Sequence, residues 1–330
     1  MVRIAVISTG GTFFSKPGAD GLSPEFTEED RESLMKEVGS DVELTIKNFM
    51  QIDSSNINPE YWHLLAEEIR STEDSCDGIV VIQGTDTLAY SASMLSFMLY
   101  GIQIPLVLTG SQVPYGAALS DASGNFQCAV KAASSGIPGV FVAFDHSIML
   151  GCRTSKVRSI GYHAFESINY PEVGNTNALG LHMNRDLIPA ALPERHYNFS
   201  YSDRIAVLKL FPGMPSDIIT FLAEHGYEGV YIEGFGLGGI PFLHSDILDQ
   251  IEKASKQGIP VLVGSQCIYD GSDLNVYEVG TRIRGYGGIT VRDMTEEAVV
   301  TKLMWALGHT KDRGEIQTIF ETDMVHEITL

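Results

Sequence analysis

The strongest constraint on the fold is a series of short apolar runs, rich in valine and isoleucine, that alternate with amphipathic segments. Within each run the residues do not alternate between apolar and polar, so neither face of such a strand is suited to water. The runs are Arg3–Ser8, Gly78–Gln83, Leu106–Thr109, Gly139–Phe144, Ile205–Leu210, Gly229–Glu233 and Pro260–Gly264. This pattern predicts parallel strands that are buried on both faces.

The segments between these runs have the composition of helices that cover a sheet. Pro59 follows Asn58 and suits a first helical turn, and Ser245 can cap a later helix. The expected helices are Pro59–Arg70, Ala89–Tyr100, Ala122–Ser134, Asp217–His225, Ser245–Lys256 and Thr295–Leu307. Alternating strands and helices predict an α/β fold with helices on both faces of the sheet.

The strand–helix pattern breaks between Arg185 and Asp203, where the stretch around Pro189 and Pro193 has no clear period. We therefore expect a linker at 189–203. It would join two doubly wound α/β domains, a larger N-terminal catalytic domain at 1–188 and a smaller, flavodoxin-like C-terminal domain at 204–330.

The net charge of the chain, −20 over 330 residues, argues against a nucleic-acid or anionic-membrane partner. No apolar run is long enough to cross a bilayer, and no secretory signal precedes the first strand. Cys76, Cys128, Cys152 and Cys267 are far apart and form no CxxC pair, so we expect small buried thiols rather than metal ligands. These observations predict a cytoplasmic protein.

Five polar clusters follow predicted strands. One of them follows Glu43–Met50, a further possible strand. Because the carboxyl ends of parallel strands share one edge of a sheet, the clusters should meet there. Each cluster alone is also typical of an ordinary turn or helix cap. The clusters are Ser8–Thr12, Asp53–Ser55, Gly84–Thr87, Thr109–Gln112 and Arg153–Lys156.

The chemistry that these clusters favour is attack by a threonine hydroxyl. Thr12 follows two glycines, which permit a tight turn and a close approach of the backbone to a ligand. A free hydroxyl is a poor nucleophile and needs a base or a charged neighbour. Lys156 and Asp86, acting through Thr85, are the candidates. Lys156 could instead be a solvated charge, and Asp86 could cap the helix that follows it.

One motif points elsewhere. Gly234–Gly239 matches the GxGxxG pattern of dinucleotide-binding proteins and follows a predicted strand. In that fingerprint a helix opens at the third glycine. Here Pro241 intervenes, and the next helix is expected only near Ser245. A nicotinamide-dependent oxidoreductase is therefore a weak alternative.

The motifs together resemble the L-asparaginases of the cytoplasmic, type I, bacterial and archaeal class over nearly the whole chain. Ser8–Thr12 and Ile82–Thr87 are the most specific carriers of this resemblance. The others are Leu108–Gln112, Ser120-Asp121 with Asn125, Ser265–Cys267, Asp293–Ala298 and Thr301–Leu303.

The resemblance implies an amidohydrolase that converts L-asparagine and water to L-aspartate and ammonia through a threonine acyl-enzyme. The nucleophile would be Thr12, assisted by Thr85, Asp86 and Lys156. The residues implied in substrate binding are Gly11, Asp53, Ser54, Ser55 and Gly84. No cofactor and no metal are implied. A homodimer or a dimer of dimers is implied, with sites between one subunit's first domain and a neighbour's second.

One position departs from the family pattern. Members commonly carry a tyrosine on the mobile loop after the nucleophile, and Leu22 stands at the matching position. The loop between Phe13 and Phe26 is expected to close over the substrate. Two alternatives to an asparaginase remain beside the oxidoreductase. One is the glutamine-hydrolysing, asparaginase-like subunit of a tRNA-dependent amidotransferase, and the other is a non-enzymatic sensor of amino acids.

Overall fold

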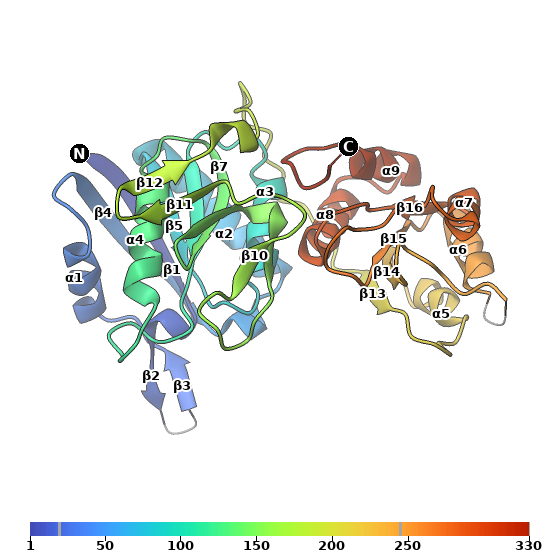
Figure 1. Ribbon diagram of the computed structural model, residues 1–330, viewed down its shortest axis with the longest axis horizontal. Helices are drawn as coiled ribbons and strands as arrows, with labels where there is room; N and C mark the ends of the chain where they lie inside the picture. The colour runs from blue at the N-terminus through green and yellow to red at the C-terminus, as the bar shows by residue number, and fades with distance from the viewer. Residues whose placement is uncertain (19–20, 244–245, 330) are drawn as a thin grey trace. The chain divides into compact units, whose positions relative to one another are not determined.

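The computed structural model describes residues 1–18, 21–243 and 246–329 (Figure 1). The chain divides into two compact units, Met1–Phe199 and Ser200–Leu330, which we call the N-terminal and C-terminal units. In the described part of the chain no helix is long and apolar enough to cross a membrane.

The N-terminal unit is built on a mixed sheet, which has eight strands among the described residues, in the order β12-β11-β8-β7-β6-β5-β1-β4. The five strands from β4 to β7 are parallel, whereas β8, β11 and β12 run antiparallel to their neighbours and lie outside the predicted set. The strands are β1 (Val2–Gly10), β4 (Val42–Ile52), β5 (Gly78–Ile82), β6 (Pro105–Thr109), β7 (Gly139–Phe144), β8 (Ser147–Leu150), β11 (Gly174–Asn177) and β12 (Gly180–Met183).

Two short ribbons, four α-helices and short 3-10 turns complete the described part of this unit. The ribbons are β2 (Ser15–Gly18) with β3 (Gly21–Pro24), and β9 (Thr154–Lys156) with β10 (Phe165–Ser167). The helices are α1 (Glu28–Lys36), α2 (Pro59–Thr72), α3 (Leu88–Met98) and α4 (Ala122–Ala133). Local signals explain where α2 begins, because the Asn58 side chain accepts the N–H groups of Glu60 and Tyr61 and Pro59 occupies the first turn.

The helices cover both faces of the larger sheet, as expected for a doubly wound domain. Helices α2 and α3 pack together, and α4 lies on the opposite face (Figure 1). The chain steps in one direction from β5 through α3 to β6 and through α4 to β7. Since α3 and α4 cover opposite faces, one of these two crossovers is left-handed, which is rare among parallel connections. The loop between β6 and α4 therefore passes to the face opposite α3.

The C-terminal unit has a parallel four-stranded sheet, in the order β13-β14-β15-β16, within its described residues. Its strands are β13 (Ile205–Lys209), β14 (Gly229–Gly234), β15 (Val261–Ser265) and β16 (Gly288–Thr290). Helices α5 and α6 and helices α6 and α7 pack together, as do α8 and α9. The helices are α5 (Ile218–Glu224), α6 (Ile247–Lys256), α7 (Glu278–Gly285), α8 (Glu296–His309) and α9 (Arg313–Glu321).

Three details correct or limit the sequence-based expectations. Asp86 does not cap the helix after it, because the N-cap position of α3 is Thr87. Cys76, Cys128 and Cys152 are buried as expected, but Cys267 is exposed. The predicted cap Ser245 lies outside the described residues, and the side chain of Asp246 accepts the Asp249 N–H at the start of α6.

Candidate active site

The turns that end β1, β5 and β6 pack against one another with no room for side chains. A Cβ atom on Gly11 would lie 2.2 Å from the Cα of Gly84, and one on Gly110 would lie 2.3 Å from the carbonyl oxygen of Gln83. A Cβ atom on Gly84 would lie 2.6 Å from the Ser54 hydroxyl. Glycine permits this backbone-to-backbone contact, and Gly11 also has a positive φ of 78°. Four of the five predicted clusters therefore gather at one edge of the sheet.

The fifth cluster joins them through Lys156 at the end of β9. Its ammonium group lies 2.8 Å from the Thr85 hydroxyl oxygen and 2.6 Å from an Asp86 carboxylate oxygen. Thr85 is buried and the Lys156 side chain is 15% exposed, whereas the Asp86 side chain is 63% exposed. Lys156 is thus a nearly buried cation that is held between a hydroxyl and a carboxylate.

The Thr85 hydroxyl is also bound to the side chain of Gln112. Thr85 donates to Gln112 Oε1 at 3.2 Å, and Gln112 Nε2 donates to the carbonyl of Gly161. With Lys156 donating to the same oxygen, the hydroxyl has one donor and one acceptor as neighbours. This arrangement orients the Thr85 proton and can transfer it to or from a bound reactant.

Thr12 begins a short 3-10 turn, Thr12–Phe14, directly after Gly11. Its side chain is partly buried, and the two phenylalanines that follow are fully packed. The Gly11 N–H donates to the carbonyl of Ile52 in β4, which fixes the turn to the neighbouring strand. Because Gly11 abuts Gly84, the turns that carry Thr12 and Thr85 lie side by side.

The predicted substrate-binding residues Asp53, Ser54 and Ser55 lie in the turn after β4. The Asp53 carboxylate accepts the N–H of Ser55 at 2.8 Å and its hydroxyl at 2.6 Å. These hydrogen bonds lower the pKa of Asp53 below its usual value. Ser54 is buried, and its carbonyl accepts the Thr87 hydroxyl at 2.8 Å, which fixes this turn to the next one.

Sequence reasoning placed Gln112 in a polar cluster but gave it no role in the site. Its backbone N–H donates to the carboxylate of Asp121, and so does that of Val113. Asn125 in α4 donates to the same carboxylate and to the carbonyl of Gly110. The motif Ser120-Asp121 with Asn125 was the available signal. It folds the loop so that Gln112 reaches Thr85.

Leu22, at the position where a family tyrosine was expected, lies in β3 opposite Pro17 and is 57% exposed. The expected mobile loop between Phe13 and Phe26 begins with two buried rings, Phe13 and Phe14, and continues into the β2–β3 ribbon. The ribbon therefore extends from a firmly packed base.

The glycine-rich stretch Gly234–Gly239 forms a tight loop rather than the start of a helix. Phe235 and Gly239 pair as an isolated antiparallel bridge, and the next helix, α6, begins at Ile247. The geometry of a dinucleotide fingerprint is missing from these described residues.

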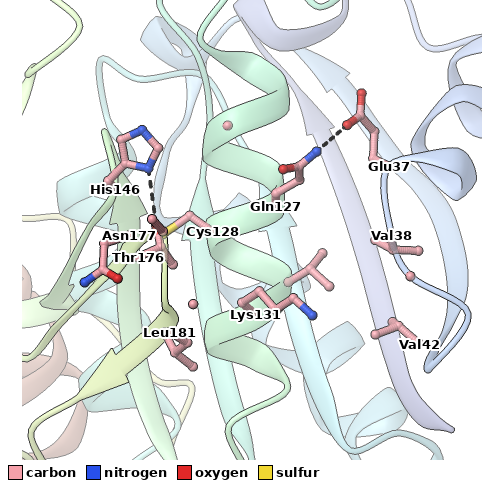
Figure 2. Close-up of a pocket in the computed structure, with 15 residues that line it drawn as sticks. Glu37, Val38, Val42, Gln127, Cys128, Lys131, His146, Thr176, Asn177 and Leu181 are labelled. Atoms are coloured by element: carbon pink, nitrogen blue, oxygen red, sulfur yellow. Dashed lines mark hydrogen bonds between the residues drawn. The ribbon is translucent and has the colours of Figure 1, made fainter.

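A cavity of about 570 Å³ lies in the N-terminal unit, over α4 (Figure 2). None of the predicted catalytic or substrate-binding residues lines this cavity.

Two family models match the chain. One, described as "Asparaginase, N-terminal", matches residues 3–189. The other, described as "Glutaminase/Asparaginase C-terminal domain", matches residues 204–320.

Individual proteins match over nearly the full chain. An L-asparaginase from Thermococcus kodakarensis is 37% identical over 99% of both chains, and the structure of the L-asparaginase from that organism has a TM-score of 0.93 at 36% identity. A glutamyl-tRNA(Gln) amidotransferase subunit from Pyrococcus abyssi is 34% identical over 99% of this chain and 77% of its own length. A structure of a probable cytoplasmic L-asparaginase from Campylobacter jejuni has a TM-score of 0.79 at 25% identity, covering 98% of this chain and all of that one.

Proposed function

This chain belongs to the asparaginase family, and from that premise we propose that it hydrolyses the side-chain amide of L-asparagine to L-aspartate and ammonia. One observation carries the proposal. The Lys156 ammonium bridges the Thr85 hydroxyl and the Asp86 carboxylate. Thr85 and Asp86 belong to the turn that contacts the Thr12 turn backbone to backbone. A nucleophile, a proton relay and a charge are therefore within one small area.

In the first half of the reaction, the Thr12 hydroxyl attacks the amide carbon and its proton passes toward the amide nitrogen. Thr85 relays this proton, because its hydroxyl can exchange the bond to Gln112 for one to the reactant. The C–N bond breaks, ammonia leaves, and an aspartyl ester forms on Thr12. Other backbone N–H groups of the two glycine turns stabilise the oxyanion, since that of Gly11 is already bonded.

In the second half, water attacks the ester and Thr12 is regenerated. Thr85, assisted by Lys156 and Asp86, accepts a proton from that water and a proton returns to the Thr12 oxygen as the ester C–O bond breaks. Asp53 is an aspartate that is ionised at neutral pH, and the hydrogen bonds from Ser55 lower its pKa further, so its carboxylate suits the α-ammonium group of the substrate. Ser54 and Ser55 complete the turn that binds the substrate's main-chain groups.

The test is ammonia release from L-asparagine by Thr12→Ala and Thr85→Ala. We expect both variants to lose turnover while retaining the thermal transition of the native protein. Thr318→Ala is the matched control, because it removes an exposed α9 hydroxyl that donates to the carbonyl of Gly314 in the same helix. Near-normal turnover in either test variant removes the role proposed for that residue. An aspartyl ester found by peptide mass spectrometry on Thr12 after an acid quench supports the acyl-enzyme.

A second candidate function is the glutaminase reaction of an amidotransferase component. Its support is the 34% identity to the Pyrococcus abyssi amidotransferase protein over 99% of this chain. The same ammonia assay decides between them when L-glutamine and L-asparagine are compared at equal concentrations. A higher kcat/KM for L-glutamine favours the second candidate and contradicts the first.

We also propose that the protein is cytoplasmic and assembles as a homodimer or a dimer of dimers. Large apolar side chains are exposed on the loops that follow the parallel strands of the C-terminal unit, and exposed apolar side chains that gather at one edge of a sheet suit a protein interface. They are Phe211, Phe235, Leu243, Ile268, Tyr269 and Tyr277. Light scattering on the native protein and on Phe211→Ser tests this, and a monomeric native protein contradicts it.

A further inference from the structure

The turn that carries Thr12 is held from behind by aromatic packing. Phe13, the next residue, is fully buried, and its ring stacks on Tyr115 with centroids 5.7 Å apart and planes at 9°. The Tyr115 N–H also donates to the Phe13 carbonyl at 2.8 Å. The ring of Phe126 in α4 also contacts Phe13 in an edge-on arrangement, with centroids 6.5 Å apart. Tyr115 therefore contacts Phe13 in two ways, by a backbone hydrogen bond and by ring stacking.

Tyr115 is in turn anchored by a carboxylate from a distant part of the chain. Its hydroxyl donates to Glu37 Oε1 at 2.8 Å, and Ser123 donates to the same oxygen at 2.8 Å. Gln127 donates to Glu37 Oε2 at 2.7 Å, as the dashed line in Figure 2 shows. Glu37 lies at the end of α1, so this single carboxylate connects α1, α4 and the β6–α4 loop.

The protonation states suit this anchor. Burial raises the pKa of Glu37, but its three hydrogen-bond donors outweigh burial and leave the pKa below its usual value. Burial and the neighbouring carboxylate raise the pKa of Tyr115 to about 12. At neutral pH the tyrosine is therefore a neutral donor to a charged acceptor, which is the stronger kind of hydrogen bond.

Tyr115 lies in the β6–α4 loop, whereas the tyrosine that the family resemblance led us to expect would lie at the position of Leu22 in β3. Leu22 at that position carries no hydroxyl and is largely exposed. Glu37 and Tyr115 are partly buried, and they support the turn through the fully buried Phe13.

We propose that Glu37 and Tyr115 are positioning residues, which hold the Thr12 turn in place for nucleophilic attack. The inference rests on the proposed function, because it takes Thr12 as the nucleophile. Neither residue touches the reactant. Both act through Phe13, whose displacement would move Thr12 relative to Thr85. A displacement of about 1 Å at a reacting group can reduce a rate about 100-fold.

The test compares kcat and KM for L-asparagine in two Tyr115 variants. We expect Tyr115→Leu, which removes both the stack and the hydroxyl, to reduce kcat about 100-fold with KM within about twofold. Tyr115→Phe retains the stack and should reduce kcat about tenfold. Glu37→Ala removes the same bond together with those from Ser123 and Gln127, so it should reduce kcat at least as much as Tyr115→Phe does. The double variant should be no worse than Glu37→Ala alone, because the Tyr115 hydroxyl acts through Glu37.

Tyr197→Phe is the matched control. Tyr197 donates to the buried carboxylate of Glu73 at 2.7 Å, so it forms the same kind of bond in the same unit, away from the Thr12 turn. We expect this variant to lower the thermal transition temperature and to leave kcat unchanged. A general loss of stability would affect both tyrosine variants alike, whereas positioning affects the kcat of the Tyr115 variant alone.

A second readout does not depend on activity. Hydrogen exchange at the amides of Phe13, Phe14 and Ser15 should accelerate at least about tenfold in Tyr115→Leu and remain native in Tyr197→Phe. If Tyr115→Leu retains native kcat and native exchange, the inference is overturned while the proposed function stands. If Thr12→Ala retains turnover, the proposed nucleophile is wrong. The positioning role is then overturned too, even if exchange shows that Tyr115 orders the turn.

Discussion

The contact between the Thr12 and Thr85 turns can be tested by adding one methyl group. Gly11→Ala would place a Cβ atom 2.2 Å from the Cα of Gly84 and 2.3 Å from its nitrogen, closer than packed atoms approach. Gly11 also has a φ of 78°, where alanine is strained. Gly116 offers the control, because its φ is 77° and a Cβ atom there would meet nothing within 4 Å.

Both substitutions place alanine at a positive φ, which strains the backbone. Gly11 also has a ψ of −174°, in a region that is essentially restricted to glycine, so its backbone strain of about 1–3 kcal/mol is at least as large as that at Gly116. The change in the unfolded chain, glycine to alanine, is the same in both variants and cancels in the comparison. Gly11→Ala adds an overpacking cost of about 1–3 kcal/mol, borne here by backbone atoms that cannot rotate away. We expect Gly11→Ala to be destabilised by about 1–3 kcal/mol more than Gly116→Ala.

The assay is urea unfolding of the N-terminal unit, followed separately from the rest of the chain. The chain has two tryptophans, so Trp62 reports on this unit in a Trp305→Phe background. Trp62 is 6% exposed and its indole N–H donates to Ser91, so its fluorescence should respond to loss of packing. If the two alanine variants unfold with free energies equal within about 0.5 kcal/mol, the turns do not touch as described.

Three further predictions follow from buried or bonded charges. Lys156→Met should reduce kcat for L-asparagine about 10²–10⁴-fold, because Thr85 loses its charged donor, and a kcat within about tenfold of native contradicts this role. Tyr115→Phe should destabilise the protein below about pH 10, and urea titrations should show the difference shrinking between about pH 10 and 12. The native pKa is raised to about 12, so the unfolded tyrosine ionises first. Lys302 and Glu327 form an ion pair with both side chains 0% exposed. Lys302→Met should cost about 3–5 kcal/mol in urea unfolding, because it leaves the Glu327 carboxylate buried without its cation. Adding Glu327→Leu should recover only part of this cost, since Glu327 also accepts the N–H groups of Met324 and Val325. A Lys302→Met variant within about 1 kcal/mol of the native protein contradicts the pairing.

The sequence predicted much of this fold because local patterns report burial. A continuous apolar run such as Gly78–Ile82 indicates a strand covered on both sides wherever it lies in the sheet. The pattern did not indicate β8, β11 and β12, which are short and reverse direction after β7. Nor could it indicate that α3 and α4 lie on opposite faces, since both follow a strand in the same way.

The candidate site divides in a similar way. Glycines next to hydroxyl residues marked Gly11 and Gly84 in the sequence, because close backbone approach requires glycine. The bond from Lys156 to Thr85 joins residues 71 positions apart, and its geometry required the fold. Gln112 stood in a predicted polar cluster without a role, and Tyr115 carried no sequence signal. Their roles depend on which side chains of the β6–α4 loop turn toward the site.

The sequence by itself determined where the backbone can be buried and where it can turn, because both properties depend on residues close together in the chain. The tertiary structure alone decided which remote side chains meet. Glu37 reaches Tyr115 across 78 positions because the fold brings the end of α1 against the β6–α4 loop. A local pattern cannot encode that encounter, since it depends on the path of every connection between the two residues.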